Sequence, residues 1–147
     1  MTLDKLSIKI KLLNQEATIP FYANDDDAGL DLFSTIEAEI KPNETSLIKT
    51  GIALELPKGY EAQIRPRSGL ALKNSITVLN TPGTIDSGYR GEIGVIIINH
   101  GKDTFIVKNK MKIAQMVINK YEKVTFEVVD NLSTTKRSDG GFGSTGQ

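Results

Sequence analysis

Residues 52–64 read IALELPKGYEAQI, and this stretch decides the fold class. Apolar side chains stand at every second position on both sides of the turn signal Pro57-Lys58-Gly59. Because successive side chains of a β-strand point to opposite faces, a period of two predicts two strands joined by a turn. The same alternation returns at residues 6–12 and at Phe126 and Val128, so it extends over most of the chain.

The segment GVIIIN (94–99) is apolar without interruption, which predicts a strand that is buried on both faces. Turn signals recur about every 8–12 residues along the chain, and a short helical turn is expected within 69–73. Many short strands separated by regular turns predict an all-β barrel or sandwich.

The C-terminal residues 131–147 differ from the rest because Leu132 and Phe142 are their only large apolar side chains. A segment that can bury so little stays disordered by itself. We therefore expect a β-barrel catalytic domain over residues 1–130 and a flexible glycine-rich lid over residues 131–147. The sequence GGFGSTG (140–146) is not a P-loop, since no Lys-Ser or Lys-Thr pair follows its last glycine.

Composition limits the chemistry that this chain can perform. Its 147 residues fit one domain, and 18 basic and 18 acidic residues cancel, so no nucleic-acid or membrane partner is expected. Cysteine is absent and His100 is the only histidine, which excludes disulfides, a Ser-His-Asp triad and a multi-histidine metal site. No signal peptide or transmembrane stretch is visible, so a cytoplasmic location is expected. The site must use carboxylates, hydroxyls, amides, arginines and backbone groups.

Arginine is rare in this chain, and all four arginines lie in segments that carry glycine and serine. Arg65 and Arg67 belong to RPRSGLA (65–71) and Arg90 belongs to DSGYRGE. Arg137 lies in the C-terminal lid, residues 131–147, which we also call the arm. A guanidinium binds phosphate or carboxylate bidentately, which lysine does not, so these segments predict oxyanion binding. Chance placement on the surface is the alternative.

The segment NTPGTIDSGYRGEIGV (80–95) is typical of a hairpin, and Asp86 is its best-placed carboxylate. An ionised aspartate can orient a water molecule and accept its proton. The alternative is an aspartate that only caps the turn above Gly88. Tyr89 is either a packing residue or a platform for a sugar or base. Asp31, between Leu30 and Leu32 on a predicted strand, must meet a cation or hydrogen-bond donors if it is buried.

Taken in order, five segments resemble the motifs of the trimeric dUTP diphosphatase (dUTPase) family. They are AGLDLFS (28–34), RPRSGLA (65–71), NTPGTIDSGYRGEIGV (80–95), KIAQMV (112–117) and RSDGGFGSTG (137–146). The resemblance implies a distorted jelly-roll-type β-barrel of the β-clip group. It also implies a homotrimer whose three active sites each use all three subunits, and hydrolysis of dUTP to dUMP and pyrophosphate with Mg²⁺.

The resemblance also implies a role for each matching residue. Asp86 corresponds to the carboxylate that activates the attacking water, and Asp31 to an aspartate that supports the metal indirectly, through water. Arg67 corresponds to a neighbour that holds the phosphate ligands of the barrel near Asp86. The phosphate ligands implied for the barrel are Ser68, Gly69 and Gln115.

Recognition of deoxyuridine is implied for the hairpin and the arm. The Asn80 amide and backbone groups of Gly83, Thr84 and Ile85 would imitate a pairing partner for uracil, and Tyr89 would pack under the deoxyribose. The implied contacts of the arm are stacking of Phe142 on uracil and binding of the γ-phosphate by Arg137, Gly143, Ser144 and Thr145.

Two alternatives remain open at this point. A dCTP deaminase shares the fold family but needs a carboxylate that pairs with the amino group of cytosine, and it lacks the glycine-rich lid. A dUTPase-fold protein with an added protein-binding regulatory role would show an inserted segment or a lost motif, and neither is visible here.

Overall fold

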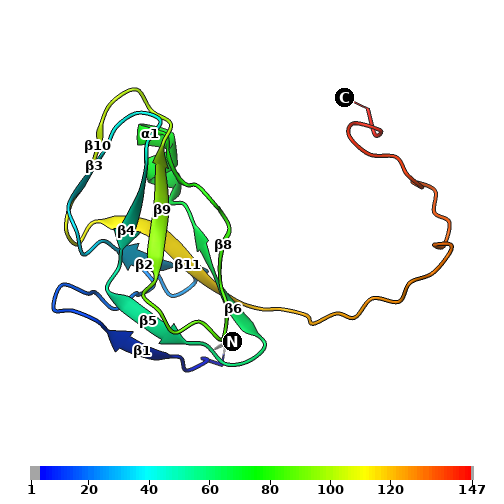
Figure 1. The fold of residues 1–147 in the computed structure, drawn as a ribbon, viewed down its shortest axis with the longest axis horizontal. Helices are drawn as coiled ribbons and strands as arrows, with labels where there is room; N and C mark the ends of the chain where they lie inside the picture. The colour runs from blue at the N-terminus through cyan, green and yellow to red at the C-terminus, as the bar shows by residue number, and fades with distance from the viewer. Residues whose placement is uncertain (1–3, 147) are drawn as a thin grey trace.

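The computed structural model describes residues 4–146, which form eleven β-strands and one short α-helix (Figure 1). The strands are β1 (Lys9–Leu12), β2 (Leu30–Phe33), β3 (Ala38–Ile40), β4 (Thr45–Lys49), β5 (Ile52–Glu55), β6 (Tyr60–Arg65), β7 (Ile76–Val78), β8 (Gly83–Ile85), β9 (Gly94–Asn99), β10 (Phe105–Val107) and β11 (Lys112–Lys120), and the helix is α1 (Ser68–Asn74).

Antiparallel pairing organises these strands into four small sheets. The largest has the order β2-β11-β6-β8, the second has the order β4-β9-β7, and β1-β5 and β3-β10 form two-stranded ribbons. Figure 1 shows the sheets wrapped around one another, with α1 at one end of the body. The prediction of an all-β, jelly-roll-type fold is confirmed, although the described strands do not close into a single barrel.

The core lies between the sheets and consists of branched aliphatic side chains. The alternation that the sequence shows at residues 60–64 is realised in β6, where Ala62 and Ile64 are buried and their neighbours are half-buried. Ile48 of β4 and Ile52 of β5 are completely buried beside them. Burying one such side chain contributes about 1.5–3 kcal/mol, so these alternate positions dominate the stability of the fold.

The prediction that residues 94–99 are buried on both faces is wrong for the single chain. In β9 only alternate residues are buried, among them Val95 and Ile97, whereas Ile96 and Ile98 are half-buried. β4 and β7 pair with the two edges of β9, but no described layer of this chain covers its second face completely. The apolar run therefore leaves a partly exposed apolar surface.

The strand predicted from Phe126 and Val128 is also absent. These side chains are 91% and 97% exposed, and residues 121–129 pair with no strand in the described part of the chain. The N-terminal alternation forms a strand only from Lys9, although it is visible in the sequence from residue 6. Apolar alternation therefore predicts strands that do not form where the same chain provides no partner strand.

The helical turn predicted within 69–73 is confirmed as α1. Arg67, the N-cap residue of the helix, is extended, as N-cap residues typically are. The helix ends where Ser75 takes a left-handed conformation (φ 56°) and donates its N–H to the Ala71 carbonyl at 3.1 Å. This local termination returns the chain to β7.

After β11 the chain leaves the body as a long extended segment (Figure 1). Its side chains are almost all exposed, and it contains no helix or strand within the described residues. The division of the chain after residue 130 stays a prediction. None of the described helical residues forms a helix of the length and apolarity that crossing a membrane requires.

Asn99 is the buried polar residue on which the end of β9 depends. Its side-chain amide donates to the Ile40 and Asp103 carbonyls, both at 2.8 Å, and its oxygen accepts the Gly101 N–H at 2.8 Å. We predict that Asn99→Ala lowers the free energy of unfolding by about 2–4 kcal/mol, because buried backbone groups lose their partners.

Urea unfolding at a fixed protein concentration measures this loss. Asn109→Ala is the matched control, since the Asn109 amide bonds only an exposed Glu16 carboxylate, and its effect is expected to stay within about 0.5 kcal/mol. Equal midpoints for the two variants would contradict the role assigned to Asn99.

Candidate active site

The pairing of β11 on both sides brings three of the predicted segments together. Gln115 of β11 faces Asp31 of β2 across one edge and Arg65 of β6 across the other. The loop after β6 then places Arg67 and α1 beside the same end of the sheet. Segments that are more than 80 residues apart in sequence therefore meet at one site.

A pocket of about 340 Å³ lies at this end of the sheet, and we call it the β11 pocket. The phosphate ligands that the resemblance implies for the barrel, Ser68, Gly69 and Gln115, all line it. Its lining residues are Ala23, Asp27, Ala28, Gly29, Asp31, Arg67, Ser68, Gly69, Lys112 and Gln115.

Asp31 is the charged centre of the β11 pocket. Its side chain is only 13% exposed, and its two oxygens meet Lys112 Nζ at 3.0 Å and Arg67 Nε at 3.6 Å. The Arg67 guanidinium also donates to the Lys112 carbonyl at 3.5 Å. The prediction that a buried Asp31 meets a cation is confirmed. Removing either cation would leave the poorly solvated Asp31 carboxylate with only one partner, so the three side chains depend on one another.

Gln115 crosses the floor of the same pocket. Its Nε2 donates to the Pro66 carbonyl at 3.0 Å, which ties β11 to the loop that leads into α1. Gly29 lies directly against this side chain, and any Cβ at position 29 would collide with Gln115 Oε1. A Cβ at position 29 would therefore force the Gln115 side chain to shift.

Ser68 and Gly69 begin α1 at the edge of the β11 pocket, and both are exposed. The first turn of α1 has no side-chain cap and no acidic residue. A hydroxyl and unpaired backbone N–H groups therefore face solvent next to the Arg67 and Lys112 cations. This arrangement suits the oxygens of an anion.

A second pocket, of about 300 Å³, lies beside the hairpin, and we call it the hairpin pocket. It contains four of the residues expected to recognise substrate or activate water, together with parts of β4 and β9. Its lining residues are Leu47, Lys49, Thr84, Ile85, Asp86, Tyr89, Glu92, Gly94 and Ile96. The two pockets have no lining residue in common.

Asp86 begins the turn at the end of β8, and the residue is exposed. Its backbone carbonyl accepts the Tyr89 N–H at 3.1 Å, so the turn is closed by main-chain atoms. Within residues 4–146 its carboxylate has no hydrogen-bond donor and no ion-pair partner. The alternative in which Asp86 serves to cap the turn therefore has no support.

Two side chains hold the turn from within. Arg90 Nη1 donates to the Ser87 carbonyl at 2.6 Å and to the Tyr89 carbonyl at 3.1 Å. The Tyr89 hydroxyl donates to the Glu92 carbonyl at 2.9 Å, and its ring lies over Gly91, where a Cβ would come within 2.5 Å of it. The ring is thus fixed while nearly half of the residue remains exposed.

Before the turn, β8 forms the edge of its sheet. It pairs with β6 on one side, and no strand of the described residues pairs with its other side. The Asn80 amide lies against Gly83, where an added Cβ would approach Asn80 Nδ2 to 3.2 Å. An amide and an open strand edge therefore stand side by side next to the hairpin pocket.

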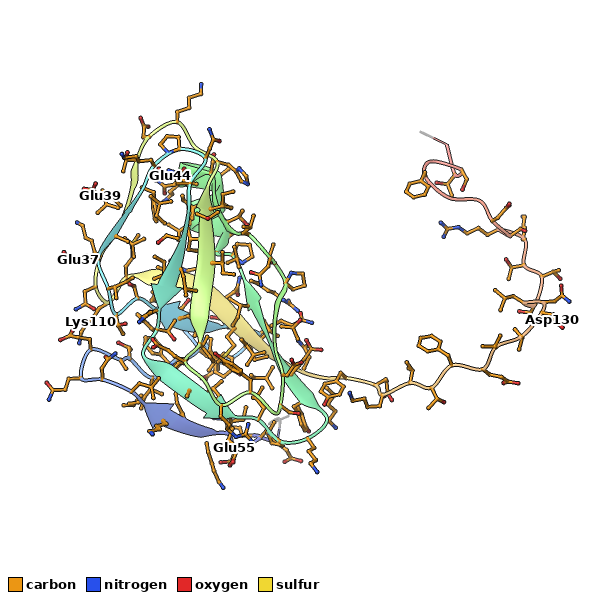
Figure 2. The ribbon with its side chains drawn as sticks, in the orientation of Figure 1. Glu37, Glu39, Glu44, Glu55, Lys110 and Asp130 are labelled. Carbon is orange, nitrogen blue, oxygen red and sulfur yellow. The ribbon has the colours of Figure 1, made fainter. Side chains whose placement is uncertain are left out.

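The predicted residues of the arm lie away from both pockets. Figure 2 shows Asp130 well clear of the body, and the segment beyond it curves back without reaching the body. Arg137 Nε donates to the Gly140 carbonyl at 2.9 Å, and Phe142 is completely exposed. Gly143, Ser144 and Thr145 share this exposed segment. The single chain therefore divides the predicted site among three places.

Three pocket residues had no role assigned from the sequence. Lys112 begins KIAQMV but was not expected to pair with Asp31, because that contact depends on the register between β2 and β11. Lys49 and Glu92 line the hairpin pocket from β4 and from the segment before β9. Lys49 lies outside the segments with unusual glycine or arginine content. Glu92 ends DSGYRGE, but nothing in that spacing shows that it lines the pocket.

The described residues contain no group of three histidine, aspartate or glutamate side chains that could hold a metal ion. Asp31, the least exposed carboxylate of the β11 pocket, already neutralises two cations. These donors fit Mg²⁺ that is held through phosphates and water, and they do not fit direct coordination by protein alone.

Comparison with known proteins agrees with this geometry. A family model described as dUTPase matches residues 15–146. The chain is 66% identical to the deoxyuridine 5'-triphosphate nucleotidohydrolase of Alkaliphilus metalliredigens over 95% of this chain and 97% of that protein. It is 64% identical to the enzyme of the same name from Trichodesmium erythraeum, over 96% of this chain and 99% of that protein.

Solved structures give the same result. The dUTPase of Staphylococcus bacteriophage 80alpha with dUPNHPP superposes with a TM-score of 0.91 at 27% identity, over 97% of this chain and 100% of that chain. A mutant dUTPase from phage phi11 of S. aureus, described with a structural Mg(II) ion, has a TM-score of 0.80 at 26% identity, over 86% of this chain and 98% of that chain. The chain belongs to the dUTPase family.

Proposed function

We propose that this chain hydrolyses dUTP to dUMP and pyrophosphate, and that Asp86 activates the water that attacks the α-phosphorus. The observation that carries the assignment of Asp86 is its exposed carboxylate, which has no cation or donor among the described residues and lies in the hairpin pocket. An unpaired carboxylate remains able to accept a proton, whereas Asp31 is held by Lys112 and Arg67.

In this reaction the Asp86 carboxylate binds the water and takes its proton as the oxygen approaches phosphorus. Assistance of this kind contributes about 10²–10⁴ in rate. The rest of the acceleration comes from alignment of the water with the leaving pyrophosphate and from neutralisation of the phosphate charge. Mg²⁺ supplies part of that neutralisation when it is bound to the phosphate chain.

The hairpin selects deoxyuridine in this proposal. The free edge of β8, from Gly83 through Thr84 to Ile85, offers backbone donors and acceptors to the edge of uracil, and the Asn80 amide adds to them. A site that hydrogen-bonds one base edge rejects a base with the wrong pattern by up to about 10⁴–10⁵. Tyr89, fixed by the Glu92 carbonyl, supports the deoxyribose.

The β11 pocket takes the phosphate chain. Ser68, Gly69 and Gln115 are the proposed ligands, and Arg67 and Lys112 give the pocket its positive charge. Asp31 keeps both cations in place and, in this proposal, also supports Mg²⁺ through water. Asp31 gives this support from its place on β2 beside β11, without contact with the substrate.

Each complete site is shared among subunits of a homotrimer. The hairpin pocket and the β11 pocket of one chain have no residue in common, and the arm lies away from both. One subunit would supply Asp86 and Tyr89, a second the β11 pocket, and a third the arm, with Phe142 over uracil and Arg137, Gly143, Ser144 and Thr145 at the γ-phosphate. The partly exposed face of β9 supports an interface between chains.

Hydrolysis of dUTP limits incorporation of uracil into DNA and supplies dUMP for synthesis of dTMP. A cytoplasmic location, expected from the sequence, is part of this proposal. A dCTP deaminase is not favoured, since the relatives with 64–66% identity are deoxyuridine triphosphate nucleotidohydrolases. An added regulatory role is not favoured by any residue described here.

The substrate assignment predicts a strong preference for dUTP. Pyrophosphate release should be Mg²⁺-dependent, and with dTTP, dCTP or UTP it should be at least about 100-fold slower at equal concentration, because each differs at the base edge or the sugar. Ammonia release from dCTP, or equal rates with dTTP and dUTP, would contradict the proposal.

For the catalytic role we predict that Asp86→Asn lowers kcat by at least about 100-fold, since the amide cannot take the proton of water. The affinity for a non-hydrolysable dUTP analogue, measured by calorimetry, should remain within a few-fold of the original. Asp103→Asn, in an exposed turn, is the matched control and should retain full activity. Turnover by Asp86→Asn close to that of the original protein would rule out the mechanism.

The shared site predicts complementation between two inactive variants. Asp86→Asn lacks the base, and a chain ending at residue 136 lacks the arm. Random mixing of the two in equal amounts should restore activity to about a quarter of the sites, because hairpin and arm then come from different subunits. If every site were built from one chain, the mixed sample would be no more active than its components.

A further inference from the structure

The turn 86–90 carries the proposed base, and its shape depends on Arg90. The Arg90 guanidinium donates to the Ser87 carbonyl at 2.6 Å and to the Tyr89 carbonyl at 3.1 Å, so two residues of the turn are bonded to one side chain. Arg90 is itself half-exposed, with a side-chain exposure of 52%. A long exposed side chain keeps one geometry only if a further partner restrains it.

Glu55 supplies that restraint. Its Oε1 lies 3.5 Å from Arg90 Nη2, and its Oε2 lies 3.1 Å from Lys9 Nζ. The hydrogen bond and charge of Lys9, followed by the charge of Arg90, lower the pKa of the Glu55 carboxyl. Figure 2 shows Glu55 at the β1–β5 end of the body, on a strand whose Ile52 and Leu54 are buried in the core.

A second restraint reaches the turn from the end of β11. The Tyr121 hydroxyl and Ser87 Oγ share a long hydrogen bond of 3.5 Å. The Tyr121 backbone N–H donates to the Gly59 carbonyl at 3.0 Å, so the residue is tied to the turn before β6. The hydrogen bond from Ser87 also lowers the pKa of Tyr121. Tyr121 is the residue at which the chain leaves the body.

We propose that Glu55 and Tyr121 are positioning residues that together hold the Asp86 turn in its reactive geometry. Glu55 acts through Arg90, and Tyr121 acts through Ser87, so neither has to contact the substrate. Glu55 ends β5 and Tyr121 directly follows β11, two strands of different sheets, and the two anchors restrain different residues of one turn. The proposal rests on Asp86 being the base and adds the residues that place it.

The reason that such weak contacts matter is geometric. Exposed ion pairs contribute little to stability, typically about 0–1 kcal/mol. A catalytic group displaced by about 1 Å, however, can lose up to about 100-fold in rate. Loss of one anchor should therefore reduce turnover while the fold and the affinity for substrate remain.

The test compares Glu55→Gln, Tyr121→Phe and the double variant with the original protein. We expect kcat for dUTP to fall about 2- to 5-fold in each single variant and about 10-fold or more in the double variant. KM, the affinity for a non-hydrolysable dUTP analogue and the melting temperature should remain unchanged. A role in overall stability would move the melting temperature, and a role in binding would move KM.

Matched controls are available for both changes. Lys9→Gln removes the other partner of Glu55 but leaves the contact with Arg90, and Tyr60→Phe removes a hydroxyl from a neighbouring tyrosine. Both controls should keep the original kcat. The proposal is overturned if the double variant keeps the original kcat, if the loss appears in KM and analogue affinity, or if Lys9→Gln loses as much as Glu55→Gln. Failure of the base assignment would appear separately, as retained turnover in Asp86→Asn.

Discussion

The pairing of β11 on both of its edges is the constraint on which the rest of this structure depends. β11 pairs with β2 on one edge and with β6 on the other. This nine-residue strand therefore fixes the positions of β2 and β6 relative to each other. Its core face, with Met116, fills the interior, and Gln115 points to the other side of the sheet. Because side chains alternate, a slip of one residue would exchange the faces of Gln115 and Met116, although Val117 on the side of Gln115 is buried as well. Hydrophobic packing therefore fixes the register, and the register assembles the polar pocket.

Two aspartates show how position within this framework sets chemical role. Asp31 lies on the strand beside β11, where little solvent reaches it, and Lys112 and Arg67 compensate for the lost hydration. Asp86 lies on a turn beyond the edge strand β8, where water solvates it and no cation claims it within the described residues. A carboxylate already paired with two cations is suited to organising them. One that is solvated and unpaired is suited to binding a water molecule and accepting its proton.

Alternation in the sequence was enough to predict the all-β fold and most strands near the core, as β5 and β6 illustrate. It failed at Phe126 and Val128, and the prediction from the uninterrupted apolar run 94–99 failed for the outer face of β9. A period of two shows that a segment can form a strand, but not whether its partner belongs to the same chain. The motifs likewise identified Asp31 and Arg67, whereas the Lys112–Asp31 contact required the β2–β11 register. Lys49, Glu92 and Glu55 could not be found in advance, because their neighbours come from distant strands.

The proposed sharing of each site among subunits would account for both the partly exposed apolar surface and the separation of the two pockets. Leu47 and Ile96 line the hairpin pocket beside Asp86, and Leu47 is 57% exposed in the single chain. Apolar side chains in such a place favour contact with another surface, since burial stabilises by about 25 cal/mol per Å². In a shared site that surface carries the β11 pocket of a neighbouring subunit. The apolar contact would then hold the phosphate-binding groups of one chain against the base of the next, so that dissociation would remove activity and stability together.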